Sequence, residues 1–215
     1  MQYMKLGDTN IRMSKVSLGT FGIGGGSSWS DTTEDENALS ETIRTAIDSR
    51  INCIDTAPVY GTGRAEIIVG KAIRGCRHNV ILSTKCSLHW RDTNGRKEYI
   101  RDGKTVYRCF QQDSIISDLE DSLRRLQTDY IDVYNVHRAP RVDEIPQLMS
   151  FLVELQKAGK IRAIGISRST PELISECMKY GRVHLAQESF SYLSTVNRIF
   201  RYASKEILFT RQMDC

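Results

Sequence analysis

The sequence lacks several features that would place it in a specialised class of protein. No run of about 18 consecutive apolar residues occurs in it, and its first residues do not combine a basic flank with an apolar stretch. We therefore expect a soluble, cytoplasmic protein that does not enter a membrane. The six cysteines lie far apart, with no C-x-x-C pair and no grouping with histidine, so we expect reduced thiols and no metal site.

The sequence also lacks a large excess of charge of one sign. The formal net charge is +4, and the basic residues are spread along the chain apart from one stretch between Arg91 and Arg108. Such a diffuse charge is not typical of nucleic-acid binding, so no nucleic-acid partner is expected. With 40% hydrophobic and 26% charged residues, the composition is that of a globular protein. The length suits one hydrophobic core, and we predict a single domain over residues 1–215.

Short apolar runs alternate with amphipathic segments along most of the sequence. A β-hairpin is expected from Tyr3 to Met13, with its turn at Gly7-Asp8. After it, the hydrophobic period predicts a repeated unit of strand and helix. Strands are expected at residues 16–18, 52–54, 80–83, 130–136, 161–166, 185–189 and 207–209. Helices are expected near residues 34–48, 64–73, 113–126, 144–158, 170–179 and 197–204.

Capping residues support the start of two of these helices. Asp31-Thr32-Thr33-Glu34 offers a cap and an acid before the first, and Ser169-Thr170-Pro171-Glu172 places Pro and Glu in the first turn of the fifth. Alternating strands and helices imply a parallel sheet, which leaves a doubly wound open sheet and a barrel as the two alternatives. A closed eight-stranded barrel typically needs about 250 residues, so a barrel in this chain is expected to lack its C-terminal part.

Four polar residues stand where predicted strands end. Asp55 directly follows the strand at 52–54, and Tyr60 lies five positions later in a loop that contains Pro and Gly. Lys85 ends the run that begins at residue 80, and His137 ends the run that begins at residue 130. Because α/β folds place their binding loops at the carboxyl ends of strands, these four side chains are expected at the same end of the sheet.

This set of side chains suits the reduction of a carbonyl group. The developing alkoxide needs a proton donor, and a tyrosine hydroxyl can supply the proton. The ordinary pKa of a phenol, about 10, is too high for easy donation at neutral pH, but an adjacent lysine ammonium lowers it. An aspartate would keep the lysine charged, and a histidine would orient the carbonyl oxygen. Taken singly, an Asp after a strand is usually a helix cap and a strand-end His is usually structural, so the prediction depends on their joint placement.

Several segments resemble the aldo-keto reductase family in their order and spacing. They are Leu18–Gly22, Ile54–Gly61, Ser83–Lys85, Ser122–Tyr134 closed by His137, and Lys157–Ser167. The resemblance implies an α/β fold, a (β/α)8 TIM barrel with an N-terminal β-hairpin, of which about six to seven strands are present and the C-terminal part is missing. It also implies NADPH or NADH as the cofactor and a small-molecule aldehyde or ketone as the substrate.

The resemblance also implies roles for particular residues. The catalytic tetrad falls on Asp55, Tyr60, Lys85 and His137, with Tyr60 as the general acid. The residues implied in cofactor binding are Gly19, Thr20, Phe21, Asp55, Ser167, Arg168, Gln187 and Phe190. Of these, Ser167 and Gln187 would hold the carboxamide, and Phe190 would stack on the nicotinamide. The family usually has Asn where this chain has Arg168, and a guanidinium only donates hydrogen bonds, so cofactor orientation and activity are expected to be affected.

Two other functions remain open at this point. The chain could be a cofactor-binding regulatory subunit without significant turnover, or an inactive truncated product.

The stretch Trp90–Arg108 is expected to be a solvated loop, with a lid over a site for anionic or polar carbonyls as the alternative. Its segment Asp102–Arg108 resembles a subgroup of bacterial reductases for small aldehydes such as methylglyoxal. The glycines between residues 22 and 26 complete no nucleotide-binding fingerprint and predict a flexible loop, and no motif indicates a protein partner or an oligomeric state.

Overall fold

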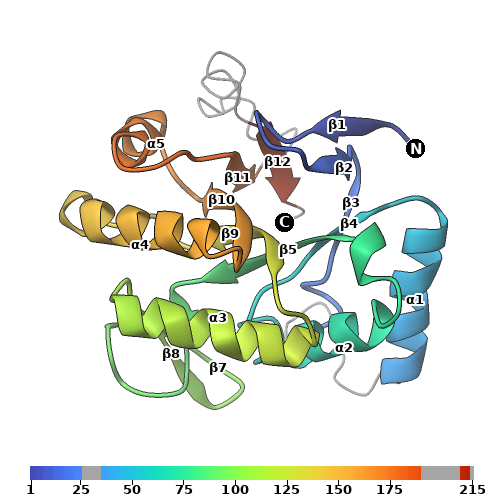
Figure 1. Cartoon of the computed structure of the whole chain (residues 1–215). Coiled ribbons are helices and arrows are strands. Elements are labelled where there is room, and N and C mark those ends of the chain that lie inside the picture. The colour runs from blue at the N-terminus through green and yellow to red at the C-terminus, as the bar shows by residue number, and fades with distance from the viewer. Residues whose placement is uncertain (26–34, 190–208, 214–215) are drawn as a thin grey trace.

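A curled parallel sheet forms the centre of the protein. The computed structural model describes residues 1–25, 35–189 and 209–213 (Figure 1). Seven strands pair in the order β12-β11-β10-β9-β5-β4-β3, and each neighbouring pair is parallel. They are β3 (Ser17–Gly19), β4 (Cys53–Asp55), β5 (Ile81–Cys86), β9 (Ile131–Val136), β10 (Ile161–Ser167), β11 (Leu185–Ser189) and β12 (Phe209–Met213). Six of the seven strand regions predicted from the sequence are confirmed, with small differences in their bounds. Of the seventh, at 207–209, only residue 209 is described, and it begins β12.

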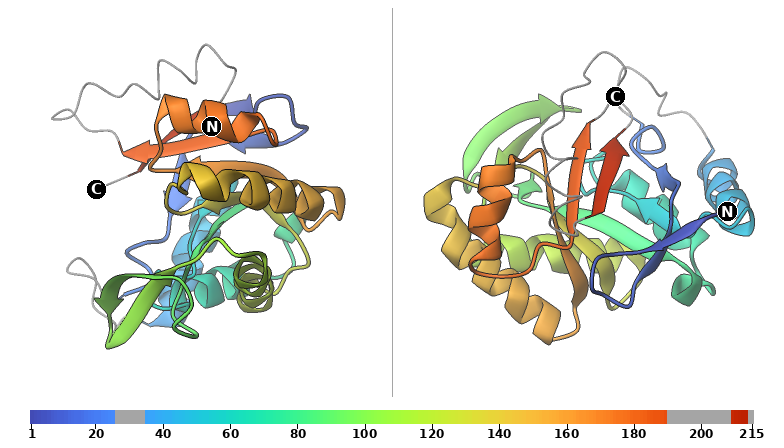
Figure 2. Two further views of the ribbon diagram at one scale, coloured as in Figure 1. Left: turned by 90° about the vertical axis from the view of Figure 1, so that its left-hand side faces the viewer. Right: turned by 90° about the horizontal axis from the view of Figure 1, so that it is seen from above.

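The helices lie around the outside of the curled sheet, as Figure 2 shows from above. They are α1 (Glu36–Asp48), α2 (Arg64–Ala72), α3 (Gln112–Leu126), α4 (Ile145–Lys157) and α5 (Pro171–Met178), with short 3₁₀ turns η1 (Arg77–Asn79) and η2 (Val142–Glu144). Five of the six predicted helices are thereby confirmed. The sixth, at 197–204, lies outside the described residues.

The two predicted helix caps have different outcomes. In α5, the Thr170 side chain accepts a hydrogen bond from the Leu173 N–H and Pro171 is the first helical residue, as predicted. The proposed cap of the first helix, at 31–34, lies outside the described residues. The described helix begins at Glu36, where the Asp35 carboxylate accepts from the Asn37 N–H.

The predicted N-terminal hairpin is confirmed and closes one end of the sheet. Strands β1 (Tyr3–Lys5) and β2 (Arg12–Ser14) pair antiparallel, and Gly7 in their turn has a φ of 52°. The fully buried side chains of Leu6 and Ile11 belong to a small cluster with residues near the starts of the sheet strands. Those residues are Cys53, Ile81, Val133, Ala163 and Leu185. The carboxyl ends of the strands lie at the opposite end.

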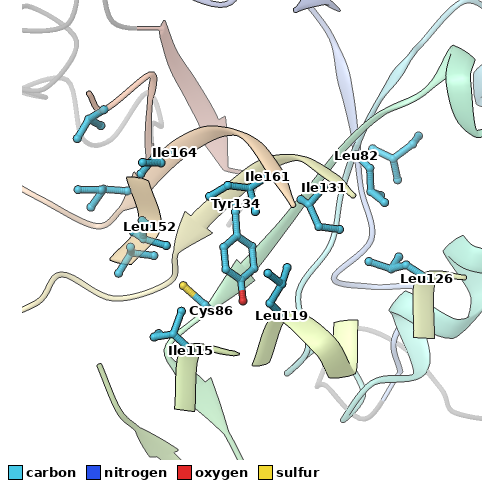
Figure 3. Packing of buried hydrophobic residues seen from close by; sticks show 14 of the residues in the cluster. Leu82, Cys86, Ile115, Leu119, Leu126, Ile131, Tyr134, Leu152, Ile161 and Ile164 are labelled. Atoms are coloured by element: carbon cyan, nitrogen blue, oxygen red, sulfur yellow. The ribbon is translucent and has the colours of Figure 1, made fainter. Parts of the chain in front are cut away.

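Alternation along the strands separates the main core from a polar interior. Ile54 and Leu82 face outward and pack in the large hydrophobic cluster between sheet and helices, part of which is shown in Figure 3. The next residues, Asp55 and Ser83, face the inside, and so does Lys85 two positions after Ser83, because successive side chains of a strand point to opposite faces. The same period that builds the core therefore directs a set of polar residues into the interior.

The stretch after β5 is ordered as a small sheet, which corrects the expectation of a loop at Trp90–Arg108. Strands β6 (Leu88–His89), β7 (Arg96–Arg101) and β8 (Lys104–Arg108) form an antiparallel sheet in the order β6-β8-β7. Between β7 and β8, Asp102 and Gly103 both have positive φ, 50° and 71°. An Asp-Gly pair favours this two-residue hairpin turn. The flanking residues are basic and polar, so they lack the alternating apolar pattern that would have indicated two strands on either side of this turn.

Three findings on the described part of the chain bear on its chemistry. Within it, no helix is long and apolar enough to cross a membrane. The five cysteines there form no disulfide with one another. No group of three or more His, Cys, Asp or Glu side chains among those residues could hold a metal ion.

Candidate active site

The four residues of the predicted tetrad meet at the carboxyl ends of β4, β5 and β9. Asp55 is the last residue of β4, and it pairs in register with Ser83 on β5. Lys85 lies two residues further along β5, and the N–H of His137, just after β9, donates to the Cys86 carbonyl at 3.1 Å. Tyr60 follows in the turns after β4. Parallel pairing of the three strands explains why residues so far apart in the sequence share one edge.

Lys85 connects three groups at the centre of this cluster. Its ammonium nitrogen lies 2.9 Å from Asp55 Oδ2, 2.9 Å from the Thr56 carbonyl oxygen and 3.1 Å from the Tyr60 hydroxyl oxygen. An ammonium has three donors, and each has an acceptor here. The Lys85 side chain is 1% exposed and that of Asp55 is 9% exposed, so the pair is held away from water. Tyr60 is therefore joined by hydrogen bonding to a buried cation.

The charge of Lys85 is maintained by its neighbours. Burial alone would lower the pKa of the ammonium, but Asp55 and Tyr60 act in the other direction and outweigh it, so the pKa of Lys85 is raised. The lysine is consequently protonated at neutral pH although it is buried. Asp55 is held in turn by the Ser83 hydroxyl, which donates to its Oδ1 at 3.0 Å.

His137 lies beside Tyr60 in its neutral form. Their rings are perpendicular, with centroids 6.1 Å apart, and His137 is partly buried. Burial holds the pKa of this imidazole well below its ordinary range, and the nearby charges of Lys85, Arg138 and Arg168 lower it further. A neutral imidazole at neutral pH keeps one N–H donor and one acceptor nitrogen. His137 can thus hydrogen-bond to an oxygen atom placed next to the Tyr60 hydroxyl.

The residues after β3 form another side of the cluster. Thr20 is buried, and both its N–H and its hydroxyl donate to the Asp55 carbonyl, at 2.9 and 3.0 Å. Phe21 is 37% exposed, and its ring meets the Tyr60 ring edge-on at 5.1 Å. Gly24 approaches the backbone of Tyr60 so closely that an added Cβ would lie 2.6 Å from its carbonyl carbon. Contact with the Tyr60 backbone therefore requires glycine at this position.

A second group of predicted residues lies on β10 and β11. Ser167 and Gln187 pair in register and are buried, and the Ser167 hydroxyl donates to Gln187 Oε1 at 3.0 Å. Arg168 is exposed, has a φ of 55°, and its N–H donates to the Gln187 carbonyl at 3.1 Å. Its charge acts on His137, which connects this group with the tetrad. Phe190 lies outside the described residues.

Sequence reasoning missed several side chains that support the cluster. Asn135 on β9 donates to the Ser83 hydroxyl at 2.9 Å, so Asp55 is held through a chain of two hydrogen bonds. Ser83 could have been found, because it lies two positions before Lys85 and so faces the same side of the strand. Asn135 could not, because its place depends on the pairing of β5 with β9.

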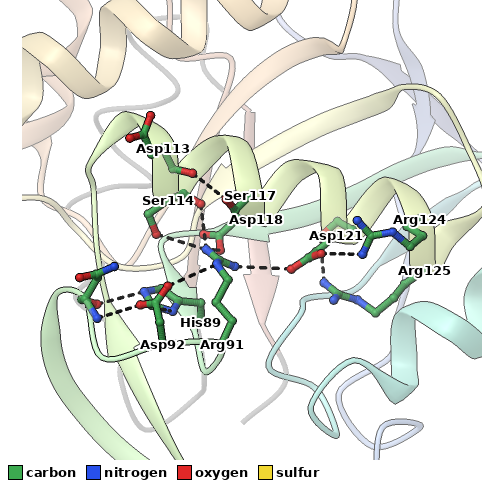
Figure 4. Close-up of polar contacts among 12 residues, drawn as sticks. His89, Arg91, Asp92, Asp113, Ser114, Ser117, Asp118, Asp121, Arg124 and Arg125 are labelled. Atoms are coloured by element: carbon green, nitrogen blue, oxygen red, sulfur yellow. Dashed lines mark hydrogen bonds and ion pairs between the residues drawn. The ribbon is translucent and has the colours of Figure 1, made fainter.

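An ion-pair network fixes the segment that leaves β5 to helix α3 (Figure 4). The buried Asp118 carboxylate accepts from the Ser87 N–H at 2.8 Å and from the Arg91 guanidinium at 2.6 Å. Burial raises the pKa of Asp118 to about 6, although Arg91 and the Ser87 N–H lower it. Ser87 follows Lys85 by two residues and has a φ of 76°. The network therefore fixes the path of the chain just beyond the tetrad.

Comparison with known proteins agrees with this fold and identifies the family. The aldo/keto reductase family model matches residues 15–208. Aldo-keto reductase YhdN of Bacillus subtilis (strain 168) is 40% identical over 193 residues, which are 89% of this chain and 54% of that protein. The NADH-specific methylglyoxal reductase of Escherichia coli (strain K12) is 36% identical over 197 residues, 90% of this chain and 60% of that protein. The chain belongs to the aldo-keto reductase family.

Solved structures are similar over nearly the whole chain. A glycerol dehydrogenase from Gluconobacter oxydans has a TM-score of 0.81 and 30% identity, over 98% of this chain and 62% of that one. The holo form of an aldo-keto reductase from Bacillus halodurans has a TM-score of 0.78 and 28% identity, over 98% of this chain and 65% of that one. The chain thus spans little more than half of the length of the curated relatives above.

Proposed function

We propose that this protein is an NAD(P)H-dependent reductase that converts small aldehydes or ketones to alcohols. The observation that carries the proposal is the buried Lys85 ammonium, shared between the Asp55 carboxylate and the Tyr60 hydroxyl. The relatives named as reductases support the same chemistry. They do not favour the alternative of a regulatory subunit without turnover.

In the proposed reaction, the Tyr60 hydroxyl gives its proton to the carbonyl oxygen of the substrate. The phenolate that remains would be stabilised by Lys85, which already donates to this oxygen. Asp55 keeps Lys85 charged, and neutral His137 would hold the carbonyl oxygen by a hydrogen bond from its N–H. When bound, the reduced nicotinamide supplies the hydride that the carbonyl carbon accepts. Each group therefore has a separate task at the same reacting atoms.

The residues on β3, β10 and β11 fit a nicotinamide. The Ser167 hydroxyl and the Gln187 amide offer donors and acceptors that match a carboxamide. An added Cβ on Gly19 would meet no atom within 4 Å, so this strand end leaves open space beside Thr20. We assign these residues, with Phe21, Asp55 and Phe190, to cofactor binding. Arg168 would supply only donors where Asn usually supplies both, and we expect it to alter the hold on the carboxamide.

We also infer that the curled sheet is part of a (β/α)8 barrel. Seven parallel strands with helices on their outer side, and the likeness to the solved reductase structures, support this inference. Residues 1–215 would belong to a single domain, which is that barrel. The cytoplasmic location stays a prediction from the sequence.

Turnover tests the proposal directly. We would follow the oxidation of NADPH and of NADH by the purified chain with a panel of small aldehydes that includes methylglyoxal. We expect oxidation that depends on the carbonyl compound and falls by about a hundredfold or more in Tyr60→Phe. Tyr107→Phe is the matched control, because its ring stacks on His89 and not on the tetrad, and it should retain activity.

Other outcomes would point to the remaining alternatives. A folded chain that binds the cofactor without turnover would favour a regulatory subunit. A chain that neither binds nor turns over would mean that the tetrad is a remnant in an inactive product. Equal activity of Tyr60→Phe and the unchanged protein would refute the assignment of the proton donor.

A further inference from the structure

The β7–β8 hairpin brings a cation to the edge of the candidate active site. The guanidinium carbon of Arg101, the last residue of β7, lies 5.2 Å from the centre of the Phe21 ring and 5.8 Å from that of Tyr99. Phe21 in turn meets the Tyr60 ring at 5.1 Å. A single aromatic ring therefore separates Arg101 from the proposed proton donor.

A second cation approaches from the end of β9. Arg138 directly follows His137, and its Nε lies 3.3 Å from an oxygen of Glu98 on β7. Arg101 and Arg138 both act on the Tyr99 hydroxyl. Burial raises the pKa of this phenol, and the two guanidinium charges oppose the rise. The two cations therefore both lie near Tyr99 of the hairpin, Arg101 next to Phe21 and Arg138 next to His137.

Positive charge exceeds negative charge around Arg101 and Arg138. Within the described parts of the chain, no carboxylate forms an ion pair with Arg101. Glu98 is shared among Arg138, Arg108 and Arg96, at 3.3, 3.2 and 3.9 Å. A partly buried cation such as Arg101, without an ion-pair partner there, favours an anion from solution. A guanidinium offers a planar set of donors that suits carboxylate or phosphate oxygens.

We propose that Arg101 and Arg138 select carbonyl substrates that carry a carboxylate or a phosphate group. The inference rests on the proposed function of the same site. The carbonyl oxygen would lie between Tyr60 and His137, and the anionic group would point to the β7–β8 hairpin. Arg101 is the specificity-determining residue in this arrangement, because Arg138 already pairs with Glu98.

The experiment compares substrates of matched shape and different charge. We would measure kcat/KM for 4-formylbenzoate against its neutral methyl ester, and for glyceraldehyde 3-phosphate against glyceraldehyde, in the unchanged protein and in Arg101→Gln. We expect the anionic compounds to be preferred, and Arg101→Gln to lower their kcat/KM about 10- to 100-fold, mainly through KM. The neutral compounds should change less than about twofold. The two pairs show whether carboxylate or phosphate is preferred.

Two further variants test whether the preference depends on the cation at position 101 or on the overall positive charge of the hairpin. Lys97→Gln removes an exposed cation from the same strand and should leave the preference unchanged. Arg101→Lys should restore part of it. Raising the salt concentration should reduce kcat/KM for the anionic compounds only, because screening weakens the attraction.

The outcomes distinguish this inference from the proposed function. Turnover of the neutral compounds without an anionic preference, or a loss in Arg101→Gln that is equal for both classes, would overturn the inference and leave the reductase intact. A rise in the KM of the cofactor alone would assign Arg101 to cofactor binding instead. If no compound is turned over, the proposed function fails, and calorimetric titration with 4-formylbenzoate decides the inference. Binding that Arg101→Gln weakens supports it, and no binding overturns it.

Discussion

Replacing Asp55 by asparagine tests the central pair of the site, because it removes one charge and keeps the shape. Asp55 Oδ2 accepts from the Lys85 ammonium at 2.9 Å, and the lysine side chain is 1% exposed. In Asp55→Asn, the Thr56 carbonyl and the Tyr60 hydroxyl remain as acceptors, but no carboxylate balances the buried charge in this cluster. The variant therefore converts a buried ion pair into a buried, uncompensated cation.

The expected cost follows from this burial. Breaking a buried pair by removing one partner typically lowers the free energy of unfolding by about 3–5 kcal/mol. The pKa of Lys85 is raised because Asp55 and Tyr60 outweigh burial, so the stability that its proton supplies is complete below the ordinary value of 10.5 and is lost only as the pH rises above it. At neutral pH the full cost should be seen. Asp143→Asn, at an exposed pair in which both side chains are at least 70% exposed, should cost less than about 1 kcal/mol.

Urea unfolding at neutral pH, followed by far-UV circular dichroism, measures these differences. The double variant Asp55→Asn/Lys85→Met carries no charge at either position, so it should recover much of the stability while it remains inactive. A loss in Asp55→Asn as small as that in Asp143→Asn would refute the reasoning, since the buried pair would then behave as an exposed one. So would a double variant that is no more stable than the single one.

Two further predictions concern the supports of the site. An added Cβ at Gly165 would lie 1.9 Å from Asn135 Oδ1, so Gly165→Ala should displace Asn135 and lower activity. In thermal unfolding it should lower the free energy of unfolding by about 1–3 kcal/mol, and Asn135→Ala should relieve the clash. Unchanged stability of Gly165→Ala would contradict this. Burial raises the pKa of Asp118 from 3.8 to about 6, so the folded protein holds this proton more tightly and stability should fall by up to about 3 kcal/mol as the pH rises through that window. Asp118→Asn should remove this component, and parallel stability curves of the two proteins would count against it.

The joint placement of the tetrad could be predicted from the sequence. Asp55, Lys85 and His137 each end an apolar run, and strands of a parallel sheet bring their carboxyl ends together. The helix bounds were also readable to within about two residues, because caps such as Thr170 and Pro171 act locally. The loop position of Tyr60 was clear, whereas its hydrogen bond to Lys85 depends on how the loops after β3 and β4 pack.

The rest of the site depends on interactions that no local pattern records. Asn135 supports Asp55 only because β5 pairs with β9 in a particular register. Arg101 reaches Phe21 only because Asp102 and Gly103 turn a basic stretch into a hairpin. Both features bring together residues that are far apart in the chain, and a local hydrophobic period does not record which distant residues meet.

The N-terminal hairpin has a consequence for the order in which the molecule folds. Its buried residues Leu6 and Ile11 share a cluster with residues near the starts of five strands, and the most distant of them, Leu185, follows after most of the described chain. Contacts between residues so far apart in sequence form slowly, because long loops must close before the contacts stabilise them. We therefore expect the contacts between the hairpin and Leu185 to form late in folding. Pairing of β4, β5 and β9, which assembles Asp55, Lys85 and His137, joins residues that are closer in sequence, so we expect it to precede those contacts.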